Sequence, residues 1–151
     1  MFNELHCDSD IQSEFFHQLS QICHNLQSLV IRLYDEASNE MKELINSQNN
    51  LKSLSLSIYN NDWSDIIPAL TKHSNTLTTL CIFSDYLPSS FISSLSNLQT
   101  IILSYSWYCT DFKELQHASF PKLKILKIHY NCLNPMYLVK FLEINGRIIC
   151  W

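Results

Sequence analysis

A short apolar pattern, leucine-x-x-leucine-x-leucine, returns along the whole chain and constrains the fold more than any other feature. Its first positions lie 24, 25, 26, 21 and 25 residues apart. Repeats of this length are typical of stacked supersecondary units, each of which buries its apolar side chains against its neighbours. The copies, some with another apolar residue in place of leucine, are Phe2–Leu5–Cys7, Leu26–Leu29–Ile31, Leu51–Leu54–Leu56, Leu77–Leu80–Ile82, Leu98–Ile101–Leu103 and Leu123–Leu126–Ile128.

The second half of each copy predicts a β-strand. In Leu54–Ser55–Leu56–Ser57–Ile58, apolar and small polar residues alternate with a period of two, which indicates a strand with one buried face. Leu51 does not fit that period, and we interpret it as the bend that leads into the strand. By the same reasoning in every copy, we expect strands centred near residues 5, 29, 54, 80, 101 and 126.

Between the strands the apolar spacing becomes helical. Phe15, Leu19, Ile22 and Leu26 are spaced four, three and four residues apart, which predicts a helix over 13–23. A helix in every unit carries the chain back before the next strand, so we expect one parallel sheet without hairpins. The 21-residue unit should have the shortest return segment. Helical apolar spacing also occurs in Met41–Leu44–Ile45, Ile66–Leu70, Phe112–Leu115 and Leu138–Phe141–Leu142. The expected helix caps are Ser64–Asp65, Ser89–Ser90 and Asn134–Pro135, and Pro68 is expected in a first turn.

Composition and charge exclude several classes of function. The chain has a single glycine, Gly146, so a glycine-rich phosphate loop or a dinucleotide fingerprint is not available. The net charge is −4 and no lysine or arginine run occurs, which argues against nucleic acid and anionic membranes as partners. No apolar run is long enough to span a bilayer, and the first ten residues lack the features of a signal peptide.

The six cysteines are widely spread and include no C-x-x-C pair, which predicts free thiols in the cytoplasm or nucleus. His6–Cys7 and Cys23–His24 lack the ligand spacing of a zinc site, so we expect no metal and no cofactor. Cys81 would point outward between Leu80 and Ile82. Its expected neighbours on adjacent strands are Ser55 and Ile102 rather than a base, so the sequence does not favour a cysteine-dependent enzyme.

The repeat resembles the leucine-rich repeat, L-x-x-L-x-L at 20–29 residues with a helix in each unit. The resemblance implies an α/β solenoid of five to six repeats over residues 1–151, with a curved parallel sheet on the concave side and helices on the convex side. One position departs from the family. Leucine-rich repeats have an asparagine or a cysteine eight residues after the first leucine, and four of five units here have another residue. The residues at this position are Tyr34, Tyr59, Asp85, Ser106 and Asn131.

The longer units, with stretches such as "NNLKSLSL" and "FPKLKILKI", resemble the repeats that follow an F-box in fungal ubiquitin-ligase receptors. This resemblance implies a module that captures a protein partner without acting as an enzyme. An alternative is a stand-alone or truncated repeat scaffold without a ubiquitin role. Residues 86–98 contain Leu87–Pro88 but fit the fourth repeat better than an F-box. Both ends look like parts of a repeat, so we expect a section of a longer array with Phe2, Leu5, Ile148 and Ile149 poorly covered.

Outward strand positions on the concave side supply the candidate binding residues. Two columns are expected, one from His6 to Lys127 and one from Asp8 to His129, with tyrosines just past the strands. Aromatic residues and arginine are the types that anchor protein interfaces. We expect a protein partner and no small-molecule substrate. The candidate partner-binding residues are Arg32, Tyr59, Phe83, Ile102, Tyr105, Lys127 and His129.

Overall fold

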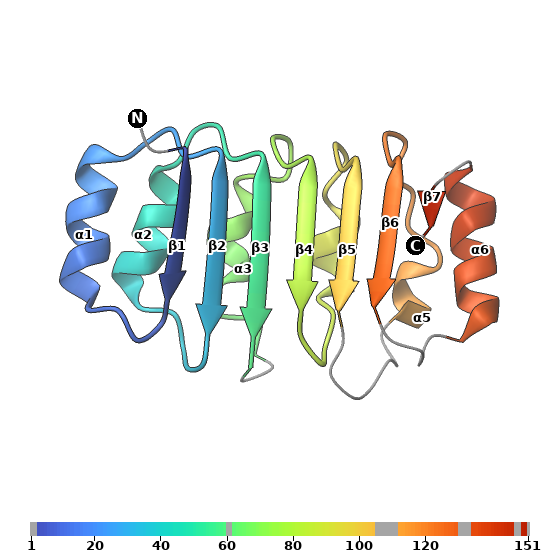
Figure 1. Ribbon diagram of the computed structural model, residues 1–151, viewed down its shortest axis with the longest axis horizontal. Helices are drawn as coiled ribbons and strands as arrows, with labels where there is room; N and C mark the ends of the chain where they lie inside the picture. The colour runs from blue at the N-terminus through green and yellow to red at the C-terminus, as the bar shows by residue number, and fades with distance from the viewer. Residues whose placement is uncertain (1–2, 60–61, 105–111, 130–133, 147–148, 151) are drawn as a thin grey trace.

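A computed structural model describes residues 3–59, 62–104, 112–129, 134–146 and 149–150. Strands and helices alternate along the described chain, as the repeat predicts (Figure 1). The strand positions agree with the expected ones to within about two residues. The elements are β1 (Glu4–Asp8), α1 (Ser13–Ile22), β2 (Ser28–Leu33), α2 (Asn39–Ser47), β3 (Ser53–Ile58), α3 (Ile67–Thr71), β4 (Thr79–Phe83), α4 (Ser89–Ser93), β5 (Thr100–Ser104), α5 (Phe112–Leu115), β6 (Ile125–His129), α6 (Pro135–Asn145) and β7 (Ile149–Cys150).

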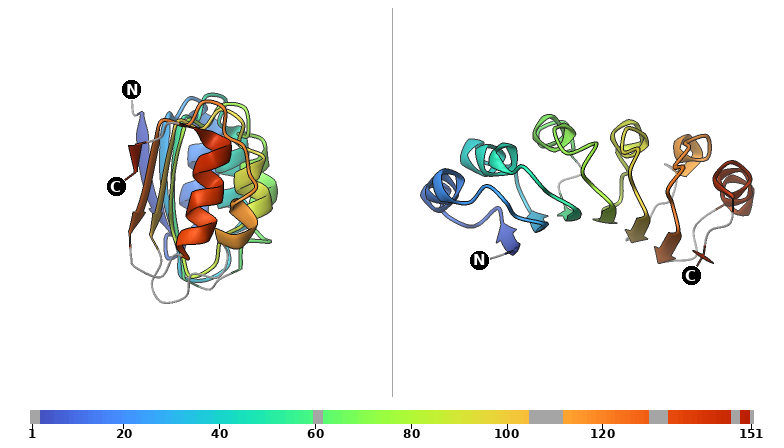
Figure 2. Two further views of the ribbon diagram at one scale, coloured as in Figure 1. Left: turned by 90° about the vertical axis from the view of Figure 1, so that its right-hand side faces the viewer. Right: turned by 90° about the horizontal axis from the view of Figure 1, so that it is seen from above.

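The strands form one parallel sheet in chain order, β1 to β7, so the prediction of a parallel sheet is confirmed. The strands lie along the inner side of an arc and the helices along its outer side, which gives a solenoid-like α/β array (Figure 2). The strand leucines of successive units lie opposite one another. Leu29 pairs with Leu54 and Leu54 with Leu80, and all three are fully buried. Leu5, at the N-terminal edge, is only half-buried.

A shared carbonyl fixes the register where each unit enters its strand. The carbonyl oxygen of Gln27 accepts the N–H groups of both Lys52 and Ser53, at 2.9 and 2.8 Å. The same arrangement recurs at the other junctions between described strands up to β6. We call these five acceptors the entry carbonyls; they belong to Asn3, Gln27, Lys52, Thr78 and Gln99.

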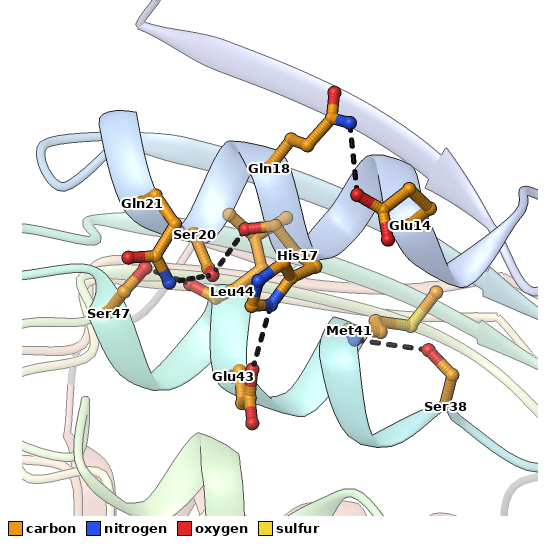
Figure 3. Close-up of polar contacts among 10 residues, drawn as sticks. All are labelled: Glu14, His17, Gln18, Ser20, Gln21, Ser38, Met41, Glu43, Leu44 and Ser47. Carbon is orange, nitrogen blue, oxygen red and sulfur yellow. Dashed lines mark hydrogen bonds and ion pairs between the residues drawn. The ribbon is translucent and has the colours of Figure 1, made fainter.

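The predicted apolar face of α1 is partly wrong. Phe16, rather than Phe15, is fully buried, and Phe15 is 43% and Ile22 77% exposed. The buried side chains of α1 are those of Phe16 and Ser20, one helical turn apart, and α1 packs against α2. Polar side chains also make contacts between the two helices at the edge of their interface. His17 lies 3.7 Å from the Glu43 carboxylate across the two helices (Figure 3).

The helix starts agree with the sequence in some units and not in others. The Asn134 side chain accepts the N–H of Met136 at 3.0 Å ahead of Pro135, and Pro68 lies in the first turn of α3, as expected. Neither α3 nor α4 has a side-chain cap, so the expected capping by Ser64–Asp65 and Ser89–Ser90 is wrong. Asp65 instead accepts the N–H of Ala37 and pairs with Lys42 of the preceding unit.

The shortest return segment lies where the 21-residue spacing predicts it. Residues 84–99 form the shortest connection between successive strands, and α4 within it has only five residues. The neighbouring α5 has four described residues, so the shortest described helix is in the next unit. Because α3, within the longer connection 59–78, also has five residues, the fourth unit is shorter in its loops rather than in its helix.

Polar side chains at the ends of three helices each connect a unit to the one before it; those of Gln48 and His73 are buried, and that of Asn145 is half-buried. Gln48 accepts the N–H of Leu26 at 3.0 Å and donates to the carbonyl of Cys23 at 2.6 Å. His73 Nε2 lies 2.9 Å from the carbonyl oxygen of Ile45, which can only accept, so Nε2 carries the proton. Asn145 contacts the backbone of residues 118 and 120 in the same way. We call these side chains the helix-end anchors; they supply hydrogen-bond partners to backbone groups at the boundaries between units.

The corresponding residue of the fifth unit is incompletely paired. Gln116 is 4% exposed, and its Nε2 donates to the carbonyl of Lys113 at 2.6 Å within the same unit. Its Oε1 has no hydrogen-bond partner among the residues that the structure describes. Among the described residues, Gln116 therefore makes no side-chain hydrogen bond to the fourth unit.

Replacing a strand leucine should cost far more stability than replacing its outward neighbour. Leu80 is fully buried, so Leu80→Ala should lower the free energy of unfolding by about 2–5 kcal/mol through the cavity that it leaves. Thr79→Ala, on the other face of β4, is the matched control and should cost less than about 1 kcal/mol. Urea unfolding followed by circular dichroism measures both. Equal losses would contradict the assigned faces of this strand.

His73 should make stability depend on pH. Burial lowers the pKa of His73 below the 6.5 of a free imidazole, so the unfolded chain takes up the proton first as the pH falls. The free energy of unfolding should be constant above about pH 7.5 and should decrease below about pH 6.5, by at most about 1.4 kcal/mol per pH unit from this group.

His73→Gln retains a donor toward Ile45 and removes the titration. The difference between the two urea-unfolding profiles from pH 5 to 8 isolates the contribution of His73, because the other five histidines are common to both proteins. Superimposable slopes below pH 6.5 would show that His73 is not the titrating group.

Candidate functional site

The inner face of the sheet carries the two columns of outward side chains that the repeat predicts. The strand register places the members of each column side by side, one from each unit. The middle column is His6, Val30, Ser55, Cys81, Ile102 and Lys127, and the second column is Asp8, Arg32, Ser57, Phe83, Ser104 and His129.

Two tyrosines that follow their strands and Phe83 of the second column form a row of three aromatic rings from consecutive units. The rings of Tyr34 and Tyr59 are stacked, with centroids 4.9 Å apart and an interplanar angle of 10°. Phe83 continues the row at 5.9 Å from Tyr59, tilted by 51°. Tyr34 is 45% and Tyr59 49% exposed, so the row presents apolar surface to solvent while its members support one another. We refer to Tyr34, Tyr59 and Phe83 as the aromatic row.

The charges of this face differ between its two ends. At the β1–β2 end, Arg32 lies 3.9 Å from Asp8 and His6 lies 2.6 Å from Glu4, so each base faces an acid. At the β6 end, Lys127 has no acidic partner among the described residues. The β6 end is therefore able to attract an acidic group, whereas the β1–β2 end is largely self-neutralised.

A shallow hollow lies between the aromatic row and β6. Phe83, Ser104, Ile128 and His129 line it, so it combines an aromatic ring, an aliphatic side chain, a hydroxyl and an imidazole. Ile128 is half-buried, unlike the fully buried Leu103 opposite it on β5. An apolar side chain placed here would contact Phe83 and Ile128 while polar groups remain at the rim.

The structure brings together six of the seven residues that the sequence analysis selects. Arg32, Phe83, Ile102, Lys127 and His129 are outward strand residues of the same face. Tyr59 follows β3 directly, and Tyr105 lies outside the described residues.

Tyr34 stacks on Tyr59 and so joins the candidate site, although it is not among the seven residues predicted from the sequence. The sequence does contain a feature that indicates this contact: Tyr34 and Tyr59 occupy the same position of consecutive repeats, eight residues after the first leucine. Side chains at equivalent positions of stacked units are neighbours in space.

The described cysteines do not form a reactive centre with a neighbouring base. Cys7, Cys23 and Cys81 are free thiols. Burial raises the pKa of Cys7 to about 12 and also raises the pKa of Cys81, an effect that Lys127 opposes in part. In register, Cys81 lies between Ser55 and Ile102, as predicted. Within the described ranges, no three His, Cys, Asp or Glu side chains are grouped to hold a metal ion, and no helix is long and apolar enough to cross a membrane.

Comparisons of the chain with protein-family models, with curated proteins and with solved structures found no match in any of the three.

Thiol alkylation should distinguish these cysteines in the native protein. Because a thiolate is the reacting species, the raised pKa of Cys7 should slow its reaction with iodoacetamide at pH 8 at least about tenfold relative to the urea-unfolded chain. The reaction of Cys81 should also be slower in the native protein, because its pKa is raised as well. Peptide mapping by mass spectrometry after timed quenching measures each site. Native Cys81 reacting faster than unfolded Cys81 would reveal an activated thiol and would reopen the enzyme hypothesis.

Proposed function

We propose that the chain is a leucine-rich-repeat module that binds a protein partner on the inner face of its sheet. The single observation that carries the proposal is the aromatic row, in which three rings from consecutive units are held together at the edge of that face. Solvent-exposed stacked aromatic side chains supply contact area at little cost in conformational entropy, and tyrosine is enriched among interface anchors.

The arrangement favours an extended partner segment that crosses several strands. One unit follows another along the sheet at the strand spacing of about 4.8 Å, so a segment lying across the array meets an equivalent position in every unit. The aromatic row would take its apolar side chains, and Lys127 and His129 would lie beside its more acidic end. Arg32 is held by Asp8 and would contribute mainly to orientation.

We further propose, from the resemblance of the repeats alone, that the partner is the substrate of an F-box-type ubiquitin ligase. On this proposal the chain recognises the substrate, and other subunits transfer ubiquitin. An F-box encoded upstream of Met1 would support this proposal. A partner whose abundance does not change on proteasome inhibition or on loss of this chain would instead favour a scaffold without a ubiquitin role.

The test compares partner capture by variants of matched size on the two sides of the array. Phe83→Ala and Tyr59→Ala should each weaken capture of the partner at least about tenfold, since truncation of an interface anchor commonly costs 2 kcal/mol or more. The partner is first identified by quantitative mass spectrometry after affinity capture, and its affinity for each variant is then measured with purified proteins.

Phe15→Ala is the control because Phe15 is an exposed phenylalanine on α1, on the helical side of the array. It should leave the affinity unchanged, and all three variants should unfold near the wild-type midpoint. Retained affinity in Phe83→Ala together with loss in Phe15→Ala would place the binding surface on the helices and would refute the proposal.

A further inference from the structure

A pocket outside the inner face of the sheet is lined by residues that have no role in the proposed binding of a protein partner. It has a volume of about 350 Å³ and lies between the segment preceding α3, the start of α4 and helix α5, so three consecutive units contribute to it. This volume falls within the range of small-molecule sites. Its main side chains are Trp63, Ile67, Tyr86, Leu87, Phe91 and Glu114.

The aromatic part of the pocket is held in place by one hydrogen bond. The indole N–H of Trp63 donates to the backbone carbonyl of Tyr86 at 3.0 Å, which ties the loop after β3 to the loop after β4. Trp63 is 4% and Phe91 5% exposed, so they form the floor. The ring of Tyr86 is 52% exposed and remains accessible to a ligand. The backbone bond does not depend on the Tyr86 side chain, which makes that side chain available for substitution.

Among the lining residues that the structure describes, one is charged, and its charge is negative. Glu114 is the only Asp, Glu, Lys, Arg or His among these described residues. Its carboxylate makes no hydrogen bond or ion pair with any residue in the described part of the chain, and α5 exposes it to solvent. A carboxylate beside an accessible aromatic ring is complementary to a cation that also has an apolar portion, because the ring face attracts positive charge.

Other classes of ligand fit these residues less well. An anion would meet Glu114 without any basic side chain in the described lining to compensate for it. A metal ion needs several oxygen, nitrogen or sulfur ligands, and the lining residues that the structure describes offer a single carboxylate with serine hydroxyls. A wholly apolar ligand would reduce the hydration of Glu114 without pairing it.

We propose that this pocket binds an alkylammonium group, with the apolar chain over Trp63 and Leu87 and the charged nitrogen between Tyr86 and Glu114. The group belongs either to a free aliphatic amine or to a lysine side chain of a bound protein, since both present the same chemistry. The site is independent of the inner face of the sheet, so its failure would leave the protein-binding function untouched.

Titration with n-hexylamine, followed by ¹H–¹⁵N NMR at pH 7 on the whole chain, tests the proposal. The indole N–H of Trp63, assigned with Trp63→Phe, is the reporter because Trp63 lines the floor of the pocket and its indole bonds to Tyr86. The resonance should shift in a saturable manner with n-hexylamine. Hexan-1-ol, which lacks the charge, should bind with at least about threefold lower affinity. Raising the salt concentration should weaken amine binding, because Glu114 is exposed. Equal affinity for the amine and the alcohol would overturn the assignment.

Two variants locate the contacts. Glu114→Gln and Tyr86→Leu should each weaken n-hexylamine binding about threefold to fivefold. Glu143→Gln, an exposed carboxylate on α6 outside the lining, is the control and should have no effect. Nα-acetyl-lysine amide distinguishes the two sources: tighter binding than n-hexylamine indicates a protein lysine, and weaker binding a free amine. Unchanged binding in Glu114→Gln, or no shift of the Trp63 resonance with either amine, would refute the site.

Discussion

The entry carbonyls are the constraint on which the rest of this structure depends. One backbone oxygen at the start of each unit accepts two N–H groups of the next, and this occurs at five junctions in succession. Such a contact fixes where one strand begins relative to its neighbour. A slip of one residue would turn every buried leucine outward, so fixing the entry also fixes the core.

The candidate binding face follows from the same constraint. Once the buried leucines are aligned, the residues between them must align on the opposite side of the sheet. The aromatic row arises because two consecutive units have tyrosine at one repeat position and the next has phenylalanine nearby. Neighbouring units differ at the positions that the core does not constrain, and these differences distinguish the β1–β2 end from the β6 end.

The strands and their columns could be predicted from the sequence because a period of two and a repeated leucine specify which side each residue faces. The buried faces and the caps of the helices are harder to predict from the sequence. Phe15 and Phe16 are adjacent, and only packing against α2 decides which of them is buried. Asp65 resembles a cap in the sequence, yet it serves the previous unit, because its partners Ala37 and Lys42 are distant along the chain.

The helix-end anchors were also missed, for a related reason. A polar residue such as Gln48 contributes nothing to an apolar pattern, and its partners Leu26 and Cys23 are more than twenty residues away. The pocket beside Trp63 needs three units in contact, so no single stretch of sequence indicates it. Long-range pairing of polar groups is the part of this fold that the repeat does not encode.

The incomplete pairing of Gln116 has a mechanical consequence for the array. Units stacked in a line transmit tension in series, so the whole is only as strong as its weakest junction. Gln48, His73 and Asn145 each reinforce a junction from within, and the indole of Trp63 joins the third unit to the fourth, whereas the buried oxygen of Gln116 leaves the boundary between the fourth and fifth units without that reinforcement. When the molecule is pulled at its two ends, the packing between the fourth and fifth units should therefore open first, while the four units before it stay stacked.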